Sequence, residues 1–293
     1  MNGFAPSDLQ GNYRRPKGIK IYSDYDINNE NRQIYLLVGN SCPWCHRTLL
    51  IYKIKDLSKH IKVILLKANI DHGEWIFDQR FKGCDSLSEL YKKSNKNSIY
   101  RPTLPLLISN KNNEINVLSN ESSQIIELLN SINKESKTKS QNIQNCDKHI
   151  LDLIHFEIND GVYKCGFARN QSSYERASKS LFSALLKIET KLNQQKGGWI
   201  CGKHLTYADI YLFPTLIRWE LVYSKLFKCT AQEISDFKKI IKWRLKFYKF
   251  SNVHQTCFEN EWKKDYYKAL FPINPSQIVP KLPSLEEIIR LNS

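Results

Sequence analysis

The pattern of hydrophobic residues changes once along the chain, and this change constrains the fold more than any other feature. Between about residues 33 and 130, short apolar runs such as QIYLLVG (33–39) alternate with helical patterns such as CHRTLLIYKIKDL (45–57). From about residue 145 onwards, only long amphipathic stretches remain. Short branched and aromatic runs predict strands, whereas apolar residues three or four apart predict helices. The sequence therefore predicts an α/β domain followed by an all-α domain.

The predicted elements of the first domain follow one another in an informative order. A second strand, KVILLKA (62–68), comes after the first strand and helix, and a polar stretch without a predicted element (69–100) follows it. TLPLLIS (103–109) and INVLS (115–119) then flank an Asn-containing turn typical of a hairpin, and NESSQIIELLN (120–130) is a predicted helix. A βαβ unit followed by a hairpin and a helix is the order of the thioredoxin fold.

These patterns divide the chain into two domains. We expect a thioredoxin-like domain over residues 1–135, in which 1–32 form an N-terminal extension. The polar segment 136–144 is a predicted linker. Residues 145–293 form a predicted helical bundle domain, whose proline-spaced tail, 273–283, is expected to be extended. The predicted helices of this domain cover 145–166, 172–195, 206–222, 231–250 and 258–269.

Composition and cysteine spacing favour a cytoplasmic protein. No apolar run approaches the roughly 18 residues of a membrane span, and the first residues lack the apolar core of a signal peptide. In the reducing cytosol we expect most cysteines to be reduced. Their spacing agrees, because only Cys42 and Cys45 lie close together and no disulfide framework is visible. The eight cysteines are Cys42, Cys45, Cys84, Cys146, Cys165, Cys201, Cys229 and Cys257.

The net charge of +15 raises nucleic acid as a partner. However, lysines are spread along every region, and no helix-turn-helix, zinc-finger or RNA-binding motif accompanies them. The densest basic stretch, KKIIKWRLKFYKF (238–250), has the spacing of a helix with a solvated basic face. We therefore expect small-molecule partners, neither a membrane nor nucleic acid. A non-catalytic binding protein that uses its basic surface remains an alternative of another class.

The motif CPWCH (42–46) follows the first predicted strand and opens the first predicted helix. A helix N-terminus favours an anion, and there the pKa of a cysteine falls from about 8.5 into the range of roughly 3.5 to 7.5. Haem attachment would require export, and structural zinc would require further ligands with metal-site spacing, which the sequence does not show. A pair of inert buried cysteines is the remaining alternative. The position favours a reactive thiol at Cys42, with no metal and no haem.

Two further segments fit a peptide-like ligand beside this thiol. Pro105 precedes the hairpin strand, where a cis peptide bond would leave the backbone of Leu104 free to pair with a ligand. Glu121 and Ser122 open the next helix, where N–H groups and a hydroxyl suit a carboxylate and an acid suits an amine. An ordinary helix start would have the same residues. With the thiol, these segments would bind the γ-glutamyl end of glutathione.

Taken together, CPWCHRTLL, RPTLPLL and NESSQIIELLN resemble the glutathione transferases of the xi class, the glutathionyl-hydroquinone reductases, and the omega-class enzymes share these motifs. The helical half resembles the reductases more specifically, through INDGVYKCGFA (158–168), LTYADIYLFPTLIRW (205–219), LVYSKLFKC (221–229), DYY (265–267) and INPSQIVP (273–280). The resemblance covers residues 30 to 280 and implies a homodimer that uses glutathione as a co-substrate.

The resemblance also implies a reaction. The Cys42 thiolate attacks the sulfur of a glutathionyl-hydroquinone, and a second glutathione resolves the mixed disulfide. The carbon leaving group needs a proton, and the tyrosines that match the family's ring-facing wall are Tyr163, Tyr223 and Tyr266 or Tyr267. The residues that match its glutathione site are Trp75, Phe77, Arg101, Leu104, Pro105, Glu121 and Ser122. We expect the site to lie in the cleft between the two domains.

Position 45 departs from the family pattern, which has CPWA where this chain has CPWC. Cys45 is therefore a candidate resolving thiol, as in glutaredoxins, or a small buried side chain in the alanine position. An omega-like thiol transferase or dehydroascorbate reductase is the alternative enzyme.

Overall fold

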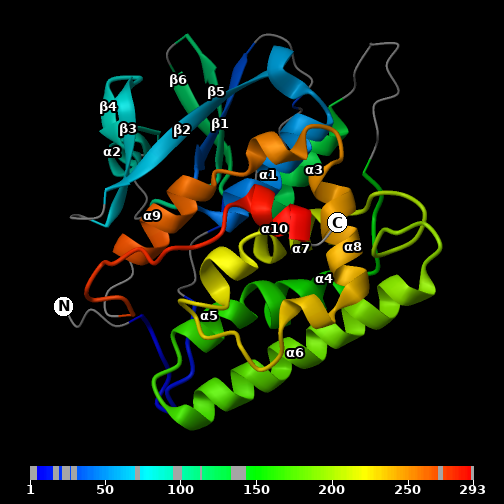
Figure 1. Cartoon of the computed structure of the whole chain (residues 1–293). Helices are drawn as coiled ribbons and strands as arrows, with labels where there is room; N and C mark the ends of the chain where they lie inside the picture. The colour runs from blue at the N-terminus through cyan, green and yellow to red at the C-terminus, as the bar shows by residue number, and fades with distance from the viewer. Residues whose placement is uncertain are drawn as a thin grey trace. The chain divides into compact units, whose positions relative to one another are not determined.

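The structure is a computed structural model that describes residues 5–15, 20–21, 27, 32–69, 73–94, 101–112, 114–132, 143–269 and 273–291. The chain forms two compact units (Figure 1). One unit contains the described residues from 20 to 132, and the other contains 5–15 together with everything from Ile143 onwards. The predicted linker, 136–144, lies mostly outside the described residues.

The first unit is built on a six-stranded mixed sheet with the strand order β4-β3-β2-β1-β5-β6 (Figure 1). β1 pairs in parallel with β2, and the remaining pairs are antiparallel. The central strand β1 is almost entirely buried, which explains its continuous apolar run. The strands are β1 (Gln33–Gly39), β2 (Ile61–Asn69), β3 (Glu74–Phe81), β4 (Cys84–Ser86), β5 (Leu106–Lys111) and β6 (Glu114–Ser119).

Three α-helices pack on this sheet. α1 (Pro43–Ile54) and α3 (Ser122–Ser131) contact each other, and α2 (Leu87–Ser94) contacts β3, β4 and β6. Lys55 is buried directly after α1, and its Nζ donates hydrogen bonds to the carbonyls of Asn130 and Ile132 at the end of α3. This cation satisfies free carbonyls at a helix C-terminus, so it fixes α1 against α3.

The thioredoxin-like order predicted from the sequence is confirmed, but the stretch 69–100 is not the structureless segment that was expected. It contains β3, β4 and α2. Hydrophobic patterning missed β3 because it lies near the sheet edge, and the side chains of Asp78, Gln79 and Arg80 are exposed there. Strands near an edge carry polar residues and lose the apolar run of a buried strand.

The second unit is helical throughout its described residues from Lys148 onwards, apart from turns and loops. Two π-helical turns, η2 (Leu153–Asn159) and η3 (Trp219–Tyr223), interrupt the α-helical segments. The tail predicted to be extended over 273–283 begins with turns over 273–276 and has no regular secondary structure from 277 to 284, and it then ends in a helix, α10, that was not predicted. The α-helices are α4 (Lys148–Asp152), α5 (Gly161–Gly166), α6 (Gln171–Gln194), α7 (Tyr207–Leu216), α8 (Lys238–Tyr248), α9 (Glu259–Ala269) and α10 (Leu285–Leu291), with short 3₁₀ turns at Ile234–Asp236 and Val253–Thr256.

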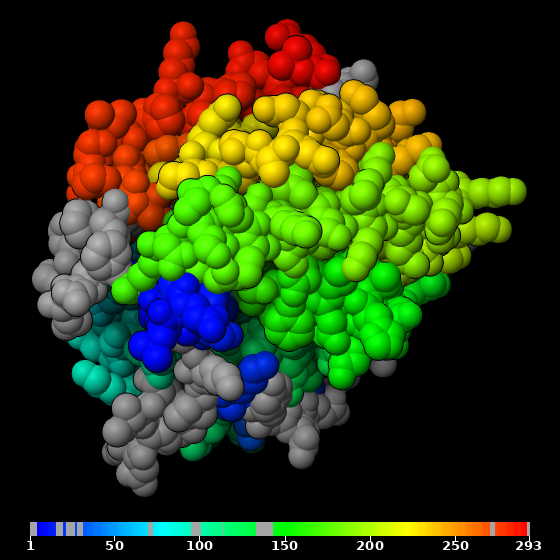
Figure 2. Space-filling model, turned by 90° about the horizontal axis from the view of Figure 1, so that it is seen from below, coloured from blue at the N-terminus to red at the C-terminus, as the bar shows by residue number. Residues whose placement is uncertain are grey.

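The N-terminal segment belongs to the helical unit, and not to the thioredoxin-like domain to which the range 1–135 assigned it. The Arg169 N–H donates to the Gly11 carbonyl (3.0 Å), and Asn170 Nδ2 donates to the Gln10 carbonyl (3.0 Å). Gly11 has a φ of 81°, and a Cβ there would lie 2.4 Å from Asn170 Nδ2. Figure 2 shows these residues (blue) against the green start of α6. Such docking depends on tertiary contacts that the sequence does not reveal.

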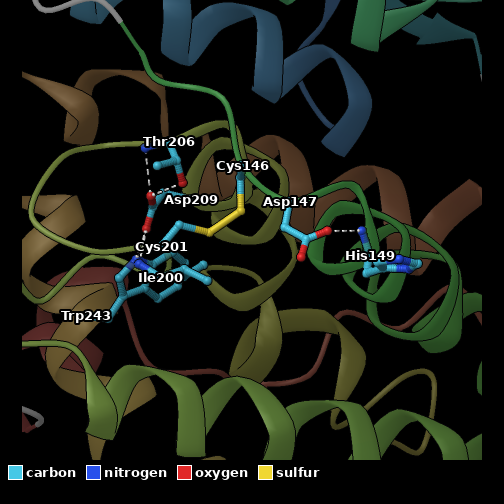
Figure 3. The surroundings of a disulfide bond; sticks show 8 residues. All are labelled: Cys146, Asp147, His149, Ile200, Cys201, Thr206, Asp209 and Trp243. Carbon is cyan, nitrogen blue, oxygen red and sulfur yellow. Dashed lines mark hydrogen bonds between the residues drawn. A yellow bond between two sulfur atoms is a disulfide. The ribbon is translucent and has the colours of Figure 1, made fainter.

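Asp209 anchors the start of α7. Its carboxylate accepts hydrogen bonds from the Ile200 N–H, from the N–H and hydroxyl of Thr206, and from Trp243 Nε1 (Figure 3). The side chain is fully buried, and burial raises its pKa above the usual value. The reciprocal bonds of Thr206 and Asp209 form the capping box that the Thr-x-x-Asp spacing predicts.

A disulfide joins Cys146, just before α4, to Cys201 in the loop that leads to α7 (Figure 3). The two segments also pair through their backbones, because the Gln144 N–H donates to the Leu205 carbonyl. The sequence analysis did not foresee this bond, since its two cysteines are separated by 55 residues. The other six cysteines, all among the described residues, form no disulfide.

Candidate functional site

Cys42 is the N-cap residue of α1, directly after the turn that ends β1. Its backbone is extended, Pro43 is the first helical residue, and Cys42 Sγ accepts a hydrogen bond from the Cys45 N–H at 3.4 Å. Cys42 as a whole residue is half-buried. The sulfur therefore sits at the positive end of the helix dipole, where N–H groups stabilise a thiolate.

Cys45 is one helical turn further on and fully buried. Its sulfur accepts a hydrogen bond from the Gly39 N–H at 3.4 Å, so the side chain is directed toward β1. The neighbouring cations do not line an open pocket either. His46 and Arg47 are buried, and the guanidinium of Arg47 lies 4.9 Å from the ring centroid of Trp44.

The sheet register brings the predicted glutathione residues to one end of the sheet. Leu106, at the start of β5, pairs with Leu37 near the end of β1. Pro105 therefore lies at the same end of the sheet as Cys42, which follows β1. The Leu104–Pro105 peptide bond is cis, as expected for this position. Ser119, the last residue of β6, pairs with Leu107, so Glu121 and Ser122 start at this same edge.

The pairing of β3 with β2, and of β2 with β1, places two aromatic residues of β3 near the same end of the sheet. Trp75 pairs with Ala68 and Phe77 with Leu66, which itself pairs with Gly39. A Cβ on Gly39 would lie 2.4 Å from the Trp75 ring, so the indole covers the end of β1, three residues before Cys42. Phe77 is buried, with its ring 5.4 Å from that of Phe81. Trp75 is thus near the thiol, whereas Phe77 contributes to the core.

The first turn of α3 carries an unsatisfied polar group. Ser122 is 3% exposed, and its hydroxyl has no hydrogen-bond partner among the described residues. Buried polar atoms in folded proteins are almost always paired, so this hydroxyl suits a polar ligand. Glu121 is the N-cap residue but its side chain does not cap the helix. It forms an ion pair with Lys20 at 2.9 Å instead, a cation that sequence reasoning did not single out.

Arg101 is exposed on the segment before the cis-proline, and among the described residues it forms no hydrogen bond or ion pair with the other site residues. The segment itself is held by Tyr91, whose hydroxyl donates to the Thr103 carbonyl at 3.0 Å. Burial raises the pKa of Tyr91. Arg101 therefore stays a prediction as a glutathione ligand, whereas the backbone of Leu104 is positioned by its neighbours.

In the helical unit, three predicted tyrosines meet at their hydroxyl groups. Tyr266 of α9 lies 2.7 Å from the hydroxyl of Tyr163 of α5 and 3.1 Å from that of Tyr223 of η3. Tyr223 is fully buried, and burial raises its pKa well above the usual value. Tyr163 is half-buried, so it is the most accessible member of this tyrosine cluster.

Tyr267 does not join the tyrosine cluster. Its hydroxyl donates to the Leu221 carbonyl at 3.2 Å, and burial raises its pKa to about 12. Aromatic rings enclose the cluster instead. Phe227 lies 5.2 Å from the Tyr163 ring, and Phe167 stacks on Tyr13 of the N-terminal segment at 5.3 Å.

Among the described residues, no group of three or more His, Cys, Asp or Glu side chains could hold a metal ion. Within the same residues, no helix is long and apolar enough to span a membrane.

Comparisons with known proteins agree on one family. Models of the glutathione S-transferase N-terminal and C-terminal domains match residues 41–132 and 171–250. The glutathionyl-hydroquinone reductase YqjG of Escherichia coli is 31% identical over 263 residues, which cover 85% of this chain and 79% of YqjG. PcpF of Sphingobium chlorophenolicum, another glutathionyl-hydroquinone reductase, is 31% identical over 273 residues, with 89% and 86% covered.

Solved structures support the same assignment. The crystal structure of glutathione S-transferase Xi from Phanerochaete chrysosporium matches with a TM-score of 0.84 at 28% identity, covering 96% of each chain. The glutathione-bound structure of YqjG matches with a TM-score of 0.76 at 30% identity, covering 88% of this chain and 87% of that one. The chain therefore belongs to the glutathione S-transferase family, in the xi class that includes the glutathionyl-hydroquinone reductases.

Proposed function

We propose that this protein is a glutathione-dependent reductase that removes glutathione from glutathionyl-hydroquinones. The observation that carries the proposal is Cys42 at the N-terminus of α1. It lies at the same strand ends as a cis-proline and as the Ser122 hydroxyl, which has no hydrogen-bond partner among the described residues. A cysteine in this place favours attack on a sulfur atom. The relatives YqjG and PcpF carry the name of this activity.

The first step forms a mixed disulfide. The Cys42 thiolate attacks the sulfur of the glutathionyl group, a new S–S bond forms, and the bond between that sulfur and the ring carbon breaks. The electron pair of the broken bond passes to the ring carbon, which must take up a proton to leave as hydroquinone. We propose that the tyrosine cluster supplies this proton, with Tyr163 as the donor and Tyr266 as its hydrogen-bond partner.

The second step regenerates the thiolate. The thiolate of a second glutathione attacks the glutathione sulfur of the mixed disulfide, and glutathione disulfide leaves. The sum of both steps converts a glutathionyl-hydroquinone and one glutathione into hydroquinone and glutathione disulfide. Cys45 takes no part in this scheme, because its sulfur is buried against Gly39.

Glutathione binding in this proposal relies on residues of the α/β unit. Ser122 and the N–H groups that open α3 receive the γ-glutamyl carboxylate, and Glu121 receives the amine. The ammonium of Lys20 forms an ion pair with Glu121. In this proposal it moves from Glu121 toward the γ-glutamyl carboxylate of glutathione when the amine of glutathione binds Glu121. Trp75, Arg101 and the Leu104 backbone complete the proposed set.

A second candidate function is omega-like thiol transfer or dehydroascorbate reduction. A relative from Schizosaccharomyces pombe, named glutathione S-transferase omega-like 2, is 30% identical over 283 residues, and this chain has a second cysteine at position 45. Rates on a glutathionyl-hydroquinone and on a small glutathione mixed disulfide separate the two functions. We expect kcat/KM to be higher for the glutathionyl-hydroquinone than for the small mixed disulfide. A higher kcat/KM for the small disulfide would contradict the proposal.

A homodimer in the cytoplasm is the setting that we propose for this activity. The family resemblance supports the dimer, and the composition together with six free cysteines supports a reducing compartment. Light scattering of the purified protein tests the dimer, since a monomeric mass across micromolar concentrations would contradict it.

A further inference from the structure

A surface hollow of the helical unit lies outside the proposed reaction. Its volume is about 480 Å³, which falls in the range of small-molecule sites, and it is formed by three segments. These segments are the end of α5 with the residues that follow it, the first turn of α6, and the turn 224–230 after η3. In Figure 2 the green start of α6 and the yellow segment lie on the same face.

The lining of this hollow is unbalanced in charge. It includes the cations Arg169, Lys225 and Lys228, and no Asp or Glu side chain lines it. The ammonium groups of Lys225 and Lys228 have no hydrogen bond or ion pair with any described residue. Arg169 Nη2 donates to the Ala5 carbonyl at 2.7 Å, so the N-terminal segment holds this guanidinium in place.

The backbone around the hollow is fixed by contacts that do not use the ammonium groups of Lys225 and Lys228. The Tyr174 hydroxyl donates to the Lys228 carbonyl at 2.6 Å, which ties the turn 224–230 to α6. Asn170 Oδ1 accepts from the Ser173 N–H and caps the helix. The nearest acidic residue on α6, Glu175, accepts a hydrogen bond from Gln171 Nε2 at 2.9 Å. Among the residues that line the hollow, the three cations thus face no carboxylate.

A second hollow on α6 offers an internal comparison. It has a volume of about 340 Å³ and is also basic, through Arg176, Lys179 and Lys187, but Glu157 lines it as well. Glu157 accepts a hydrogen bond from Ser180 there. Both hollows are thus lined by three cations, but a carboxylate lines the second hollow and none lines the first.

We propose that the hollow lined by Arg169, Lys225 and Lys228 binds a small, multiply charged anion of the phosphate class, such as a phosphate ester. Two lysines and an arginine arranged around one cavity match a tetrahedral dianion, because each can donate to a different oxygen. The hydroxyl of Ser224 offers a further donor, and the N-terminal end of α6 adds its dipole to the attraction.

The site would connect ligand binding with the tyrosine cluster, although the proposal does not depend on the reductase activity. Cys165 and Gly166 of α5 line the hollow, and a Cβ on Gly166 would lie 2.5 Å from the Phe227 ring. Phe227 in turn contacts Tyr163. Two of the segments that line the hollow, α5 and the turn after η3, are therefore those that carry or directly follow Tyr163 and Tyr223.

The test is isothermal titration of the full chain with inorganic pyrophosphate at low salt. We expect saturable one-to-one binding, weakened about tenfold or more in Lys225→Gln/Lys228→Gln because two charge-assisted contacts are lost. The matched control, Lys179→Gln/Lys187→Gln, removes the same charge from the other hollow and should change the affinity less than about twofold, since distant exposed charges are screened. Lys225→Arg/Lys228→Arg should retain binding.

Three results would overturn the proposal. One is the absence of saturable binding, and another is an equal loss of affinity in the control variant, which would indicate a general effect of the net charge. The third is equal affinity for succinate, which would remove the preference for phosphate. Thr230→Glu guards against misfolding of the lysine variant, because it places a carboxylate in an otherwise intact hollow and should abolish pyrophosphate binding.

Discussion

The two units contribute to the proposed reaction through different physical arrangements. In the α/β unit, the backbone positions Cys42, Pro105 and Ser122 at one end of the sheet. There β1 and β6 end, and β5, α1 and α3 begin. In the helical unit, side chains from three separate elements meet at the hydroxyl of Tyr266. The backbone therefore sets the positions of the α/β site residues, whereas the position of each tyrosine hydroxyl depends on its partners. Substitutions in the two units should therefore have different consequences.

The largest effect should come from Cys42→Ala, which removes the proposed nucleophile. We expect the variant to lose deglutathionylation entirely, because Cys45, the other thiol in the first turn of α1, is fully buried. Cys42→Ser should be nearly inactive, since a hydroxyl ionises far less readily than a thiol. Steady-state turnover of a glutathionyl-hydroquinone measures both. Substantial turnover by the alanine variant would exclude Cys42 as the nucleophile.

Tyr163→Phe tests the other half of the comparison. Removing a group that assists proton transfer should lower kcat by about ten- to a hundredfold, without a matching change in glutathione binding. Tyr267→Phe is the control, because its hydroxyl bonds the Leu221 carbonyl and lies outside the tyrosine cluster. The control should lose about 1 kcal/mol of stability and keep its turnover. Equal losses of kcat in both variants would show that the cluster has no special role.

Glu121→Ala should act on binding rather than turnover. Loss of a charge-assisted hydrogen bond to the glutathione amine should weaken binding by about 1.5–3 kcal/mol. Ser122→Ala should have a smaller effect of the same kind, because it removes a neutral donor that has no other partner among the described residues. Calorimetry with glutathione measures both losses. A variant that binds glutathione normally would remove that residue from the proposed site.

The smallest effect on activity should follow Cys45→Ala. The sulfur is buried and accepts only a weak bond from the Gly39 N–H, so turnover should change by less than about twofold if glutathione resolves the mixed disulfide. Cleavage of a small mixed disulfide measured with the same variant is the complementary assay. A large loss there would favour the glutaredoxin-like alternative, in which Cys45 resolves Cys42.

Local sequence patterns indicate the proposed residues of the α/β unit better than those of the tyrosine cluster, for a physical reason. Cys42, Pro105 and Ser122 are each placed by the element that begins or ends beside them, so local patterns are sufficient. Tyr266 and Tyr267 are neighbours on one helix, about 100° apart, and only tertiary packing decides which of them faces Tyr163. The family resemblance, rather than the residue pattern, identified these tyrosines as candidates.

Other features lay beyond local patterns as well. β3 has the polar side chains of a strand near the sheet edge, and α10 is a short helix after a proline-spaced tail. The Cys146–Cys201 disulfide and the docking of residues 5–15 join segments that are distant in the sequence. The ion pair of Lys20 with Glu121 has the same origin, since 100 residues separate the two side chains in the sequence and no spacing indicates their contact.

The central claim is that Cys42 forms a mixed disulfide with glutathione, and intact mass spectrometry tests it most directly. After brief incubation with a glutathionyl-hydroquinone and no free glutathione, the wild-type protein should gain the mass of one glutathionyl group, and added glutathione should remove it. Peptide mapping should place this group on Cys42. Cys42→Ala should gain no mass under the same conditions, and Cys45→Ala should behave like the wild type. Unchanged wild-type mass while hydroquinone is released, or modification that persists in Cys42→Ala, would contradict the account.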